Sequence, residues 1–356
     1  MSFMENKIIV EDMFDIYRRE IKWQKFRNQT VLISGATGML ASYLVYFLIF
    51  LNEKYLMNVR IVLLARNSEK CFYRFDKFLE KEYIKLYDFN INTPWNIPDN
   101  VDYIIHAASL ASPQYYKTMP VEVAEPNVIG TYHMLNLARE KHVKKVLYFS
   151  SGDIYGKLPQ NTKFIKEDMM GIIDPLDEHS CYGESKRMGE TWCFTFNKEY
   201  QIPTVIARIG HTYGPTMDLE NDPRVFASFM KCVFNKENIV MYSDGRAKRP
   251  FCYIADATAA FLLLLLEGKS GEAYNVCNSN SFISILELAN ILVGLQPELN
   301  LKVIRKVRSM DESYLENRAN HDNLPTEEKL KKLGWECHFG VESGFRRVLD
   351  SFLEKI

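Results

Sequence analysis

The chain has 356 residues, of which 47% are hydrophobic and 25% charged, and its net charge is -1 at pH 7. This composition is that of a soluble globular protein, and the balanced charge argues against a nucleic-acid partner. The seven cysteines include no C-x-x-C pair, which argues against a disulfide framework or a metal site and favours a reducing cytoplasm.

No membrane segment is expected. The first ten residues lack the apolar run of a signal peptide. The apolar stretches 44–51 and 261–266 are far shorter than the roughly 20 residues of a membrane span, so they indicate buried core helices.

Residues 8–27 have the spacing of an amphipathic helix, which we assign to an N-terminal helical extension over residues 1–28. We expect this extension to pack on the core or on a partner subunit. Nothing in it indicates chemistry.

A strand over 30–34 is followed at once by a G-x-x-G-x-x-A loop over 35–41 and a long apolar helix. Strand, glycine loop and helix in this order predict a dinucleotide site, because the glycines let the backbone approach a pyrophosphate at the helix N-terminus. The predicted contacts are Gly35, Thr37, Gly38, Met39 and Leu40.

The second strand, over 59–65, ends at Arg66. An acidic residue is expected there in an NAD site, whereas an arginine can pair with the 2′-phosphate of NADP, with Lys70 close enough to help. We therefore favour NADP(H). The alternative is that Arg66 stacks on adenine and that NAD(H) is bound.

Further strands over 84–88, 101–108 and 145–151, with a helix over 121–141, alternate as in a doubly wound parallel sheet. Asp88 and Phe89 should reach the adenine, and Ala107 and Ala108 should pass under the cofactor. His106 is interpreted as a packing residue rather than a base. Asn127 and Ser150 are further predicted cofactor contacts.

The strand over 145–151 ends in Ser151, followed closely by Asp153. At the carboxyl end of a strand both side chains can face the ligand. Ser151 can share a hydrogen bond with the reacting oxygen. Asp153 can transfer a second proton, or can cap the following turn.

Tyr182 and Lys186 lie four residues apart at the start of a predicted helix. At this spacing both side chains share one helix face, so the lysine charge should lower the pKa of the tyrosine from its ordinary value of about 10. Such a tyrosine can exchange the proton of an alcohol that becomes a carbonyl.

Together the glycine loop, Ser151 and the Tyr-x-x-x-Lys pair resemble the extended short-chain dehydrogenase/reductases that act on nucleotide sugars, and most closely the UDP-glucuronate decarboxylase type. Further similar stretches are residues 105–113, 181–187, 207–215, 224–225, 245–256 and 334–336. The resemblance implies that Tyr182 is the acid/base, that Lys186 also holds the nicotinamide ribose, and that Ser151 orients the reacting oxygen. It also implies a homodimer through helices at 121–141 and 180–200.

The resemblance further implies a Rossmann-type α/β domain over 29–209 and 246–270, and a smaller substrate-binding lobe over 210–245 and 271–356. Arg224 and Arg249 would contact the substrate diphosphate and Tyr242 the base. The expected substrate contacts are Ser109, Ser112, His211, Arg224, Val225, Tyr242, Arg249 and Arg318.

The chain departs from the family pattern at several positions. Gly152 removes the acid of the 4,6-dehydratases, Asp153 is one methylene shorter than the decarboxylase glutamate, and His211 replaces an asparagine. With Arg66, these differences favour an NADPH-dependent reductase of a keto sugar nucleotide, with a CDP-linked ketose of surface (capsule) polysaccharide biosynthesis as a candidate substrate.

Two alternatives remain open from the sequence. The first is a nucleotide-sugar epimerase or decarboxylase with retained NAD. The second is an NADP-binding sensor or scaffold without catalysis, against which the serine, tyrosine and lysine argue.

Overall fold

The computed structural model describes residues 3–306 and 323–354, and its largest feature is a parallel sheet with the strand order β11-β7-β5-β4-β1-β2-β3. Its strands are β1 (Thr30–Ser34), β2 (Arg60–Ala65), β3 (Ile84–Asp88), β4 (Tyr103–His106), β5 (Lys145–Ser151), β7 (Thr204–Ile209) and β11 (Glu272–Val276). β1 pairs with both β2 and β4, so the strand order reverses between β1 and β4. Open α/β sheets bind their ligands at such a reversal.

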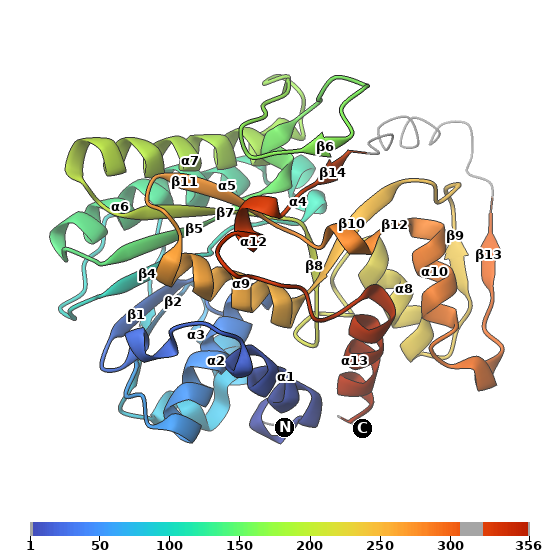
Figure 1. The fold of residues 1–356 in the computed structure, drawn as a ribbon, viewed down its shortest axis with the longest axis horizontal. Coiled ribbons are helices and arrows are strands. Elements are labelled where there is room, and N and C mark those ends of the chain that lie inside the picture. The colour runs from blue at the N-terminus through green and yellow to red at the C-terminus, as the bar shows by residue number, and fades with distance from the viewer. Residues whose placement is uncertain (1–2, 307–322, 355–356) are drawn as a thin grey trace.

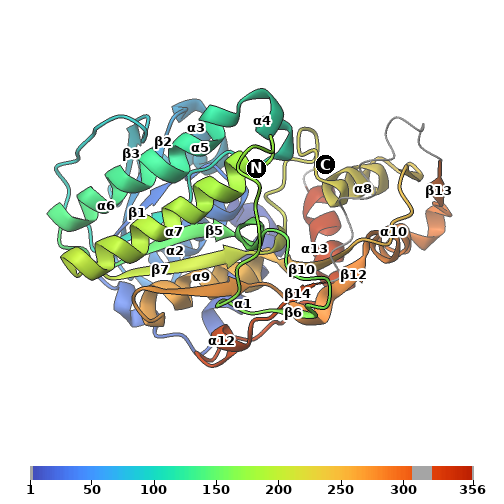
Figure 2. The ribbon, with the colours of Figure 1, turned by 90° about the horizontal axis from the view of Figure 1, so that it is seen from above.

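Helices cover both faces of the sheet (Figure 1). One face carries α2 (Met39–Tyr55), α3 (Ser68–Phe75) and α9 (Ile254–Glu267). The other carries α5 (Pro120–Glu125), α6 (Thr131–Glu140) and α7 (Ser180–Tyr200), which lie together in Figure 2. α2 and α9 are the two helices predicted from apolar runs, and nearly every residue of α9 is buried. The Rossmann-type sheet is therefore confirmed.

A smaller lobe lies on the right in Figure 1. It contains the three-stranded sheet β12-β10-β8 and the parallel pair β13-β9. Its strands are β8 (His211–Tyr213), β9 (Ile239–Met241), β10 (Lys248–Tyr253), β12 (Phe282–Ser284) and β13 (Val303–Arg305), and its helices are α8 (Val225–Phe234), α10 (Ile285–Val293) and α13 (Val341–Leu353).

Two strands lie on the other side of the predicted domain boundaries. β11 pairs with β7 at the edge of the large sheet, although 271–356 was assigned to the substrate lobe. β10 pairs with β8 and β12 in the small sheet, although 246–270 was assigned to the dinucleotide domain. Short apolar strands of this kind carry no sequence signal for the sheet that they join, because the partner is chosen by long-range pairing.

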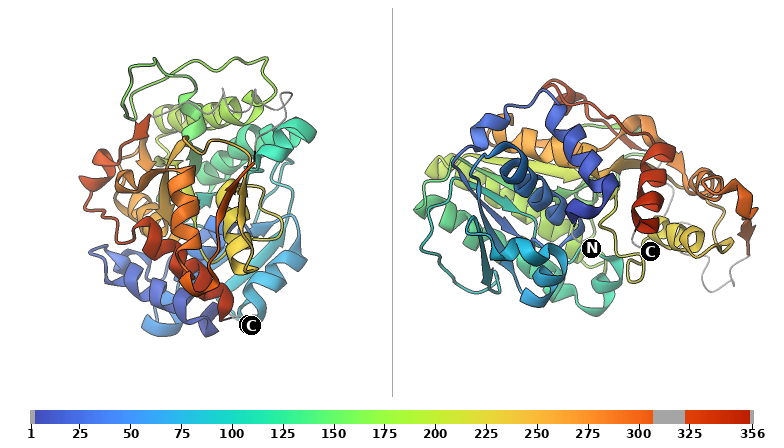
Figure 3. Two further views of the ribbon diagram at one scale, coloured as in Figure 1. Left: turned by 90° about the vertical axis from the view of Figure 1, so that its right-hand side faces the viewer. Right: turned by 90° about the horizontal axis from the view of Figure 1, so that it is seen from below.

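The N-terminal helix α1 (Lys7–Arg18) is shorter than the predicted 8–27 helix. After it the chain turns so that Trp23 and Phe26 enter the core under the sheet. Figure 3 shows α1 beside the C-terminal helix α13, and the buried Asp12 joins them through Arg347 Nε at 2.8 Å. Tyr253 of β10 also donates to Asp12, at 2.6 Å.

The predicted helix over 121–141 is divided. α5 ends at Glu125, a π-helical turn follows over Pro126–Gly130, and α6 begins at Thr131. Pro126 lacks the N–H that would continue an α-helix, and a wider turn accommodates it. α4 (Pro113–Thr118) precedes this unit.

A short strand pair and a short helix complete the fold. β6 (Phe164–Ile165) pairs with β14 (Leu324–Pro325), and α12 (Glu328–Lys331) follows. Over residues 3–306 and 323–354, no helix is long and apolar enough to cross a membrane. The same residues hold no cluster of three or more His, Cys, Asp or Glu side chains suited to a metal ion.

Candidate active site

The glycine loop joins β1 to α2 next to the end of β4. Gly35 has φ +65°, and a Cβ added there would lie 2.6 Å from Ala108 Cα. Gly38 is the N-cap residue of α2 and has no side chain to cap the helix. The first N–H groups of α2 therefore receive no hydrogen bond from a capping side chain. The loop therefore brings bare backbone and a helix N-terminus to the switch point, as a pyrophosphate requires.

The backbone after β4 is fixed from the β1 side. The Ser34 hydroxyl accepts hydrogen bonds from the N–H groups of Ala107 at 3.2 Å and Ala108 at 3.3 Å. The hydroxyls of Ser109 and Ser112 are buried and make no hydrogen bond within the described part of the chain. Two buried hydroxyls without a partner, in the segment that follows β4, are available to a ligand.

β5 and α7 bring the three predicted catalytic residues together. Ser151 ends β5, and its hydroxyl lies within hydrogen-bonding range of the buried Tyr182 phenol near the start of α7. Lys186 lies one turn further along α7, and its Nζ is 5.7 Å from the centroid of the Tyr182 ring. This part of the predicted site is assembled as expected.

The predicted effect of Lys186 on Tyr182 is wrong for the resting chain. Burial raises the pKa of Tyr182, the negative charge of Asp153 raises it further, and the hydrogen bond of Ser151 offsets only part of the rise. Lys186 Nζ instead donates to Phe149 O at 2.6 Å, and burial lowers the pKa of Lys186 to about 7. The spacing of four residues gave the shared face but not the burial of both groups.

The charge of Asp153 acts on the Tyr182 phenol, and Arg249 links Asp153 electrostatically to His211. Burial raises the pKa of Asp153, and the charge of Arg249 on β10 offsets part of that rise. On neighbouring β8, burial lowers the pKa of His211 to about 3, and the cations Arg249 and Arg224 lower it further, so this imidazole is neutral. The Asp153 N–H donates to Ser151 Oγ at 3.2 Å, so the turn is capped by serine and the carboxylate is left for chemistry.

The residues predicted to contact the substrate from the small lobe have different surroundings. Arg224 is the N-cap residue of α8 and pairs with Asp222 at 2.5 Å, so part of its charge is balanced within the lobe. Val225 is the first residue of α8, and Tyr242 is 51% exposed after β9. Arg318 lies outside the described residues.

The predicted adenine end lies where β2 and β3 finish. Asp88 is the register partner of Ala65, which places it beside the Arg66 turn. Phe89 packs between Tyr87 and Trp95, with ring centroids 5.3 and 5.7 Å away, so part of its ring is used within the domain.

Two of the predicted cofactor contacts turn out to have structural partners. The Ser150 hydroxyl donates to Glu190 at 2.5 Å, inside a network with Arg208, because β5 alternates and points Ser150 away from the cleft that Ser151 faces. The predicted cofactor contact of Ser150 is therefore not made by its side chain, which has a structural role. Asn127 is fully buried in the π-helical turn, where its Nδ2 donates to Val123 O and Ser185 Oγ.

Two tyrosines that were not predicted from the sequence border the site. The Tyr116 ring of α4 stacks on Tyr182, with centroids 5.1 Å apart and planes at 14°. The Tyr148 ring of β5 lies 5.1 Å from Lys186 Nζ. The strand alternation that relates Tyr148 to Ser150 was a usable signal, whereas nothing in the sequence points to Tyr116.

These residues fit a dinucleotide. The Gly35 turn leaves no room for a Cβ, the start of α2 is uncapped, and Ser151, Tyr182 and Lys186 meet beyond the switch point. When bound, a nicotinamide dinucleotide would supply hydride acceptance and return. The fold and the site therefore define an oxidoreductase of the short-chain dehydrogenase/reductase type.

Residues 31–277 match the NAD dependent epimerase/dehydratase family, which is more than half of the chain, and the protein belongs to this family. It is thus an enzyme of the NAD-dependent type that acts on nucleotide sugars.

Among similar proteins, UDP-glucuronic acid decarboxylase 3 of Arabidopsis thaliana is 31% identical over 327 residues, which cover 91% of this chain and 89% of the relative. UDP-glucuronic acid decarboxylase 1 of Xenopus tropicalis is 27% identical and is matched over 73% of its length by 92% of this chain.

Two solved structures share the fold at 20% identity. UDP-glucose 4-epimerase of Thermotoga maritima, in complex with UDP-glucose, has a TM-score of 0.74, over 92% of this chain and 99% of that one. WbmF of Bordetella bronchiseptica, in complex with NAD+ and UDP, has a TM-score of 0.72, over 93% of this chain and 94% of that one.

Proposed function

We propose that the enzyme decarboxylates a UDP-hexuronate, using a dinucleotide that stays bound and is restored in each turnover. The observation that carries the proposal is the chain of buried charges that begins at Tyr182: Asp153 raises the pKa of the phenol, and the charge of Arg249 offsets part of the rise in the pKa of Asp153. A cation next to the reacting phenol suits a sugar that bears a carboxylate, and the decarboxylase relatives match this chain almost from end to end.

In this proposal Arg249 pairs with the C5 carboxylate of the sugar, rather than with the diphosphate. The charge of Arg249 acts on Asp153, and that of Asp153 acts on Tyr182, which supports a place for the guanidinium near the reacting sugar. Arginine suits the role because its planar fork matches a carboxylate.

The first half of the reaction removes hydrogen from C4. Tyr182 Oη takes the proton of the C4 hydroxyl while the Ser151 hydroxyl holds that oxygen. A bound dinucleotide would supply acceptance and return of the C4 hydride, and the positive charge of its oxidised ring would favour the Tyr182 phenolate.

The second half is the loss of CO2. The 4-keto group makes the C5–carboxyl bond labile, because its electron pair can move to the C4 oxygen, which Ser151 and Tyr182 stabilise. Asp153, whose pKa is raised by burial, holds the proton that C5 takes up. Hydride return at C4 then completes a turnover that consumes one proton and releases one CO2.

A second candidate is the NADPH-dependent reduction of a keto sugar nucleotide. It is favoured by Arg66 and Lys70, which are exposed near the end of β2 and form no ion pair with any described residue. Two free cations there suit a 2′-phosphate.

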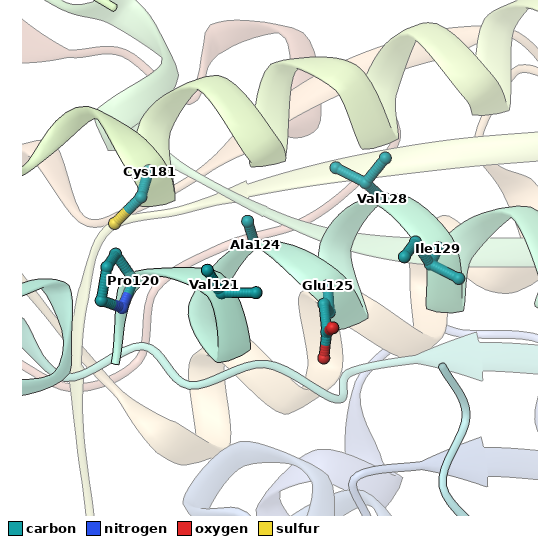
Figure 4. Close-up of a pocket in the computed structure, with 7 residues that line it drawn as sticks. All are labelled: Pro120, Val121, Ala124, Glu125, Val128, Ile129 and Cys181. Carbon is teal, nitrogen blue, oxygen red and sulfur yellow. The ribbon is translucent and has the colours of Figure 1, made fainter. Parts of the chain in front are cut away.

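We also propose a homodimer. An apolar groove between α5, the following π-helical turn and the start of α7 is lined by Pro120, Val121, Ala124, Glu125, Val128, Ile129 and Cys181 (Figure 4). Val121 is 64% exposed and Ile129 41% exposed, and a second copy of this face would cover them. Sedimentation of Val121→Asp tests this, with Leu56→Asp as a control, because Leu56 is an exposed apolar residue outside the groove, at 79%.

The function is tested by incubating the purified protein, without added cofactor, with UDP-glucuronic acid or with UDP-glucose. Release of CO2 and a UDP-pentose from the uronate alone supports the proposal, and Tyr182→Phe must abolish it. A UDP-hexose epimer from either substrate indicates an epimerase. No product without NADPH, together with reduction of a 4-keto sugar nucleotide when NADPH is added, indicates the reductase.

A further inference from the structure

The ammonium of Lys186 lies between two tyrosine rings. Its Nζ is 5.1 Å from the centroid of Tyr148 on β5 and 5.7 Å from that of Tyr182 on α7. The side chain is 2% exposed, and Nζ donates to the carbonyl of Phe149 at 2.6 Å. Much of the surface of the charge is therefore turned toward ring faces rather than toward water.

The surrounding charges do little to hold the protonated form. Glu190 and Cys193, further along α7, favour it, but the Glu190 carboxylate is already paired with Arg208 at 2.8 Å. From β4, His106 faces the lysine as a neutral ring, because burial and the lysine charge lower its pKa to about 3. Since burial lowers the pKa of Lys186 to about 7, modest contributions decide its charge at neutral pH.

Tyr148 is held in place by the shape of α7. It is 1% exposed, and a Cβ added at Gly189 would lie 2.1 Å from its phenol oxygen. Gly189 stands one turn after Lys186 on the same helix. The Tyr148 hydroxyl lies close to Thr131 in a geometry that makes no hydrogen bond. A hydrogen bond of the hydroxyl therefore does not explain why a tyrosine stands at this position.

We propose that Tyr148 is a positioning residue whose ring face holds the Lys186 ammonium beside Tyr182. A desolvated ammonium is attracted to the negative face of an aromatic ring, and this attraction stabilises Lys186 at its position next to Tyr148. The inference deepens the proposed function, because it assumes that Lys186 acts in the reaction through its charge.

The test titrates Lys186 in the resting enzyme. Protein labelled with 13C at lysine Cε is followed by NMR against pH, and the Lys186 signal is identified by its loss in Lys186→Met. In Tyr148→Leu the titration of Lys186 should move down by about one pH unit, which is the size of a desolvated cation–π contact. In Tyr148→Phe, which keeps the ring face, it should not move.

Replacement of Tyr148 by trifluorophenylalanine separates electrostatics from packing. This residue has nearly the shape of phenylalanine without the negative ring face, so it should shift the titration as Tyr148→Leu does, and it decides the question if Tyr148→Leu does not fold. An unchanged titration in the folded trifluoro variant overturns the proposal. Because no substrate is present, failure of the decarboxylase proposal leaves this result intact.

Discussion

Replacing Gly35 by alanine tests the close approach of backbone on which the cofactor site depends. Gly35 has φ +65°, and its added Cβ would lie 2.6 Å from Ala108 Cα and 2.8 Å from Ala108 N. The left-handed backbone costs alanine about 1–2 kcal/mol. Displacing the end of β4 adds about 1–3 kcal/mol, the range measured for overpacked sites.

Gly334→Ala is the matched control, because Gly334 has φ +92° and nothing lies within 4 Å of its added Cβ. We expect the control to lose only the backbone contribution and Gly35→Ala to lose about 2–5 kcal/mol of unfolding free energy. Urea unfolding of both variants gives this comparison, and fluorescence titration with NADH gives the second readout.

Gly35→Ala should weaken NADH binding at least a hundredfold, since the shifted loop no longer admits a pyrophosphate, while Gly334→Ala binds as the wild type does. A folded Gly35→Ala protein with wild-type stability and NADH affinity would refute the reasoning about this loop.

Three further predictions concern single charged side chains. Asp153→Asn should slow CO2 release about 10²–10⁴-fold. Reduction of the bound dinucleotide by the substrate should continue in this variant, and Asp153→Glu should restore CO2 release. Equal loss of both reactions would count against the role of Asp153 as proton donor. Burial raises the pKa of Asp12 to about 6 from an ordinary 3.8, so the folded protein holds this proton more tightly and the wild type should lose about 2 kcal/mol of unfolding free energy between pH 4 and pH 6. Asp12→Asn should remove that pH dependence, and unfolding at both pH values shows whether it does. Arg66→Ala should leave NADH affinity unchanged and weaken NADPH at least tenfold, as calorimetry can measure; equal effects on both would mean that Arg66 stacks on adenine.

Much of the architecture was predictable because its signals are local. The glycine loop between a strand and an apolar helix identified the cofactor end, and the apolar strands identified a parallel sheet. Tyr182 and Lys186 came from helical spacing, and α7 begins at Ser180 as expected.

What failed depended on distant parts of the chain. The pKa of Tyr182 is raised by burial and by Asp153, which lies in the turn after β5, and neither is encoded in the Tyr182–Lys186 spacing. The Asp222 partner of Arg224 and the sheet that β11 joins likewise follow from tertiary contacts. A pattern finds residues that share a helix face or a strand end, but not the groups that the fold places opposite them.

The central claim is that one bound dinucleotide is reduced and restored within each turnover. It is tested most directly by denaturing freshly purified protein and identifying the released dinucleotide by mass. We predict NAD in amounts close to one per chain. An empty site that prefers NADPH over NADH on titration would contradict this account and favour the reductase.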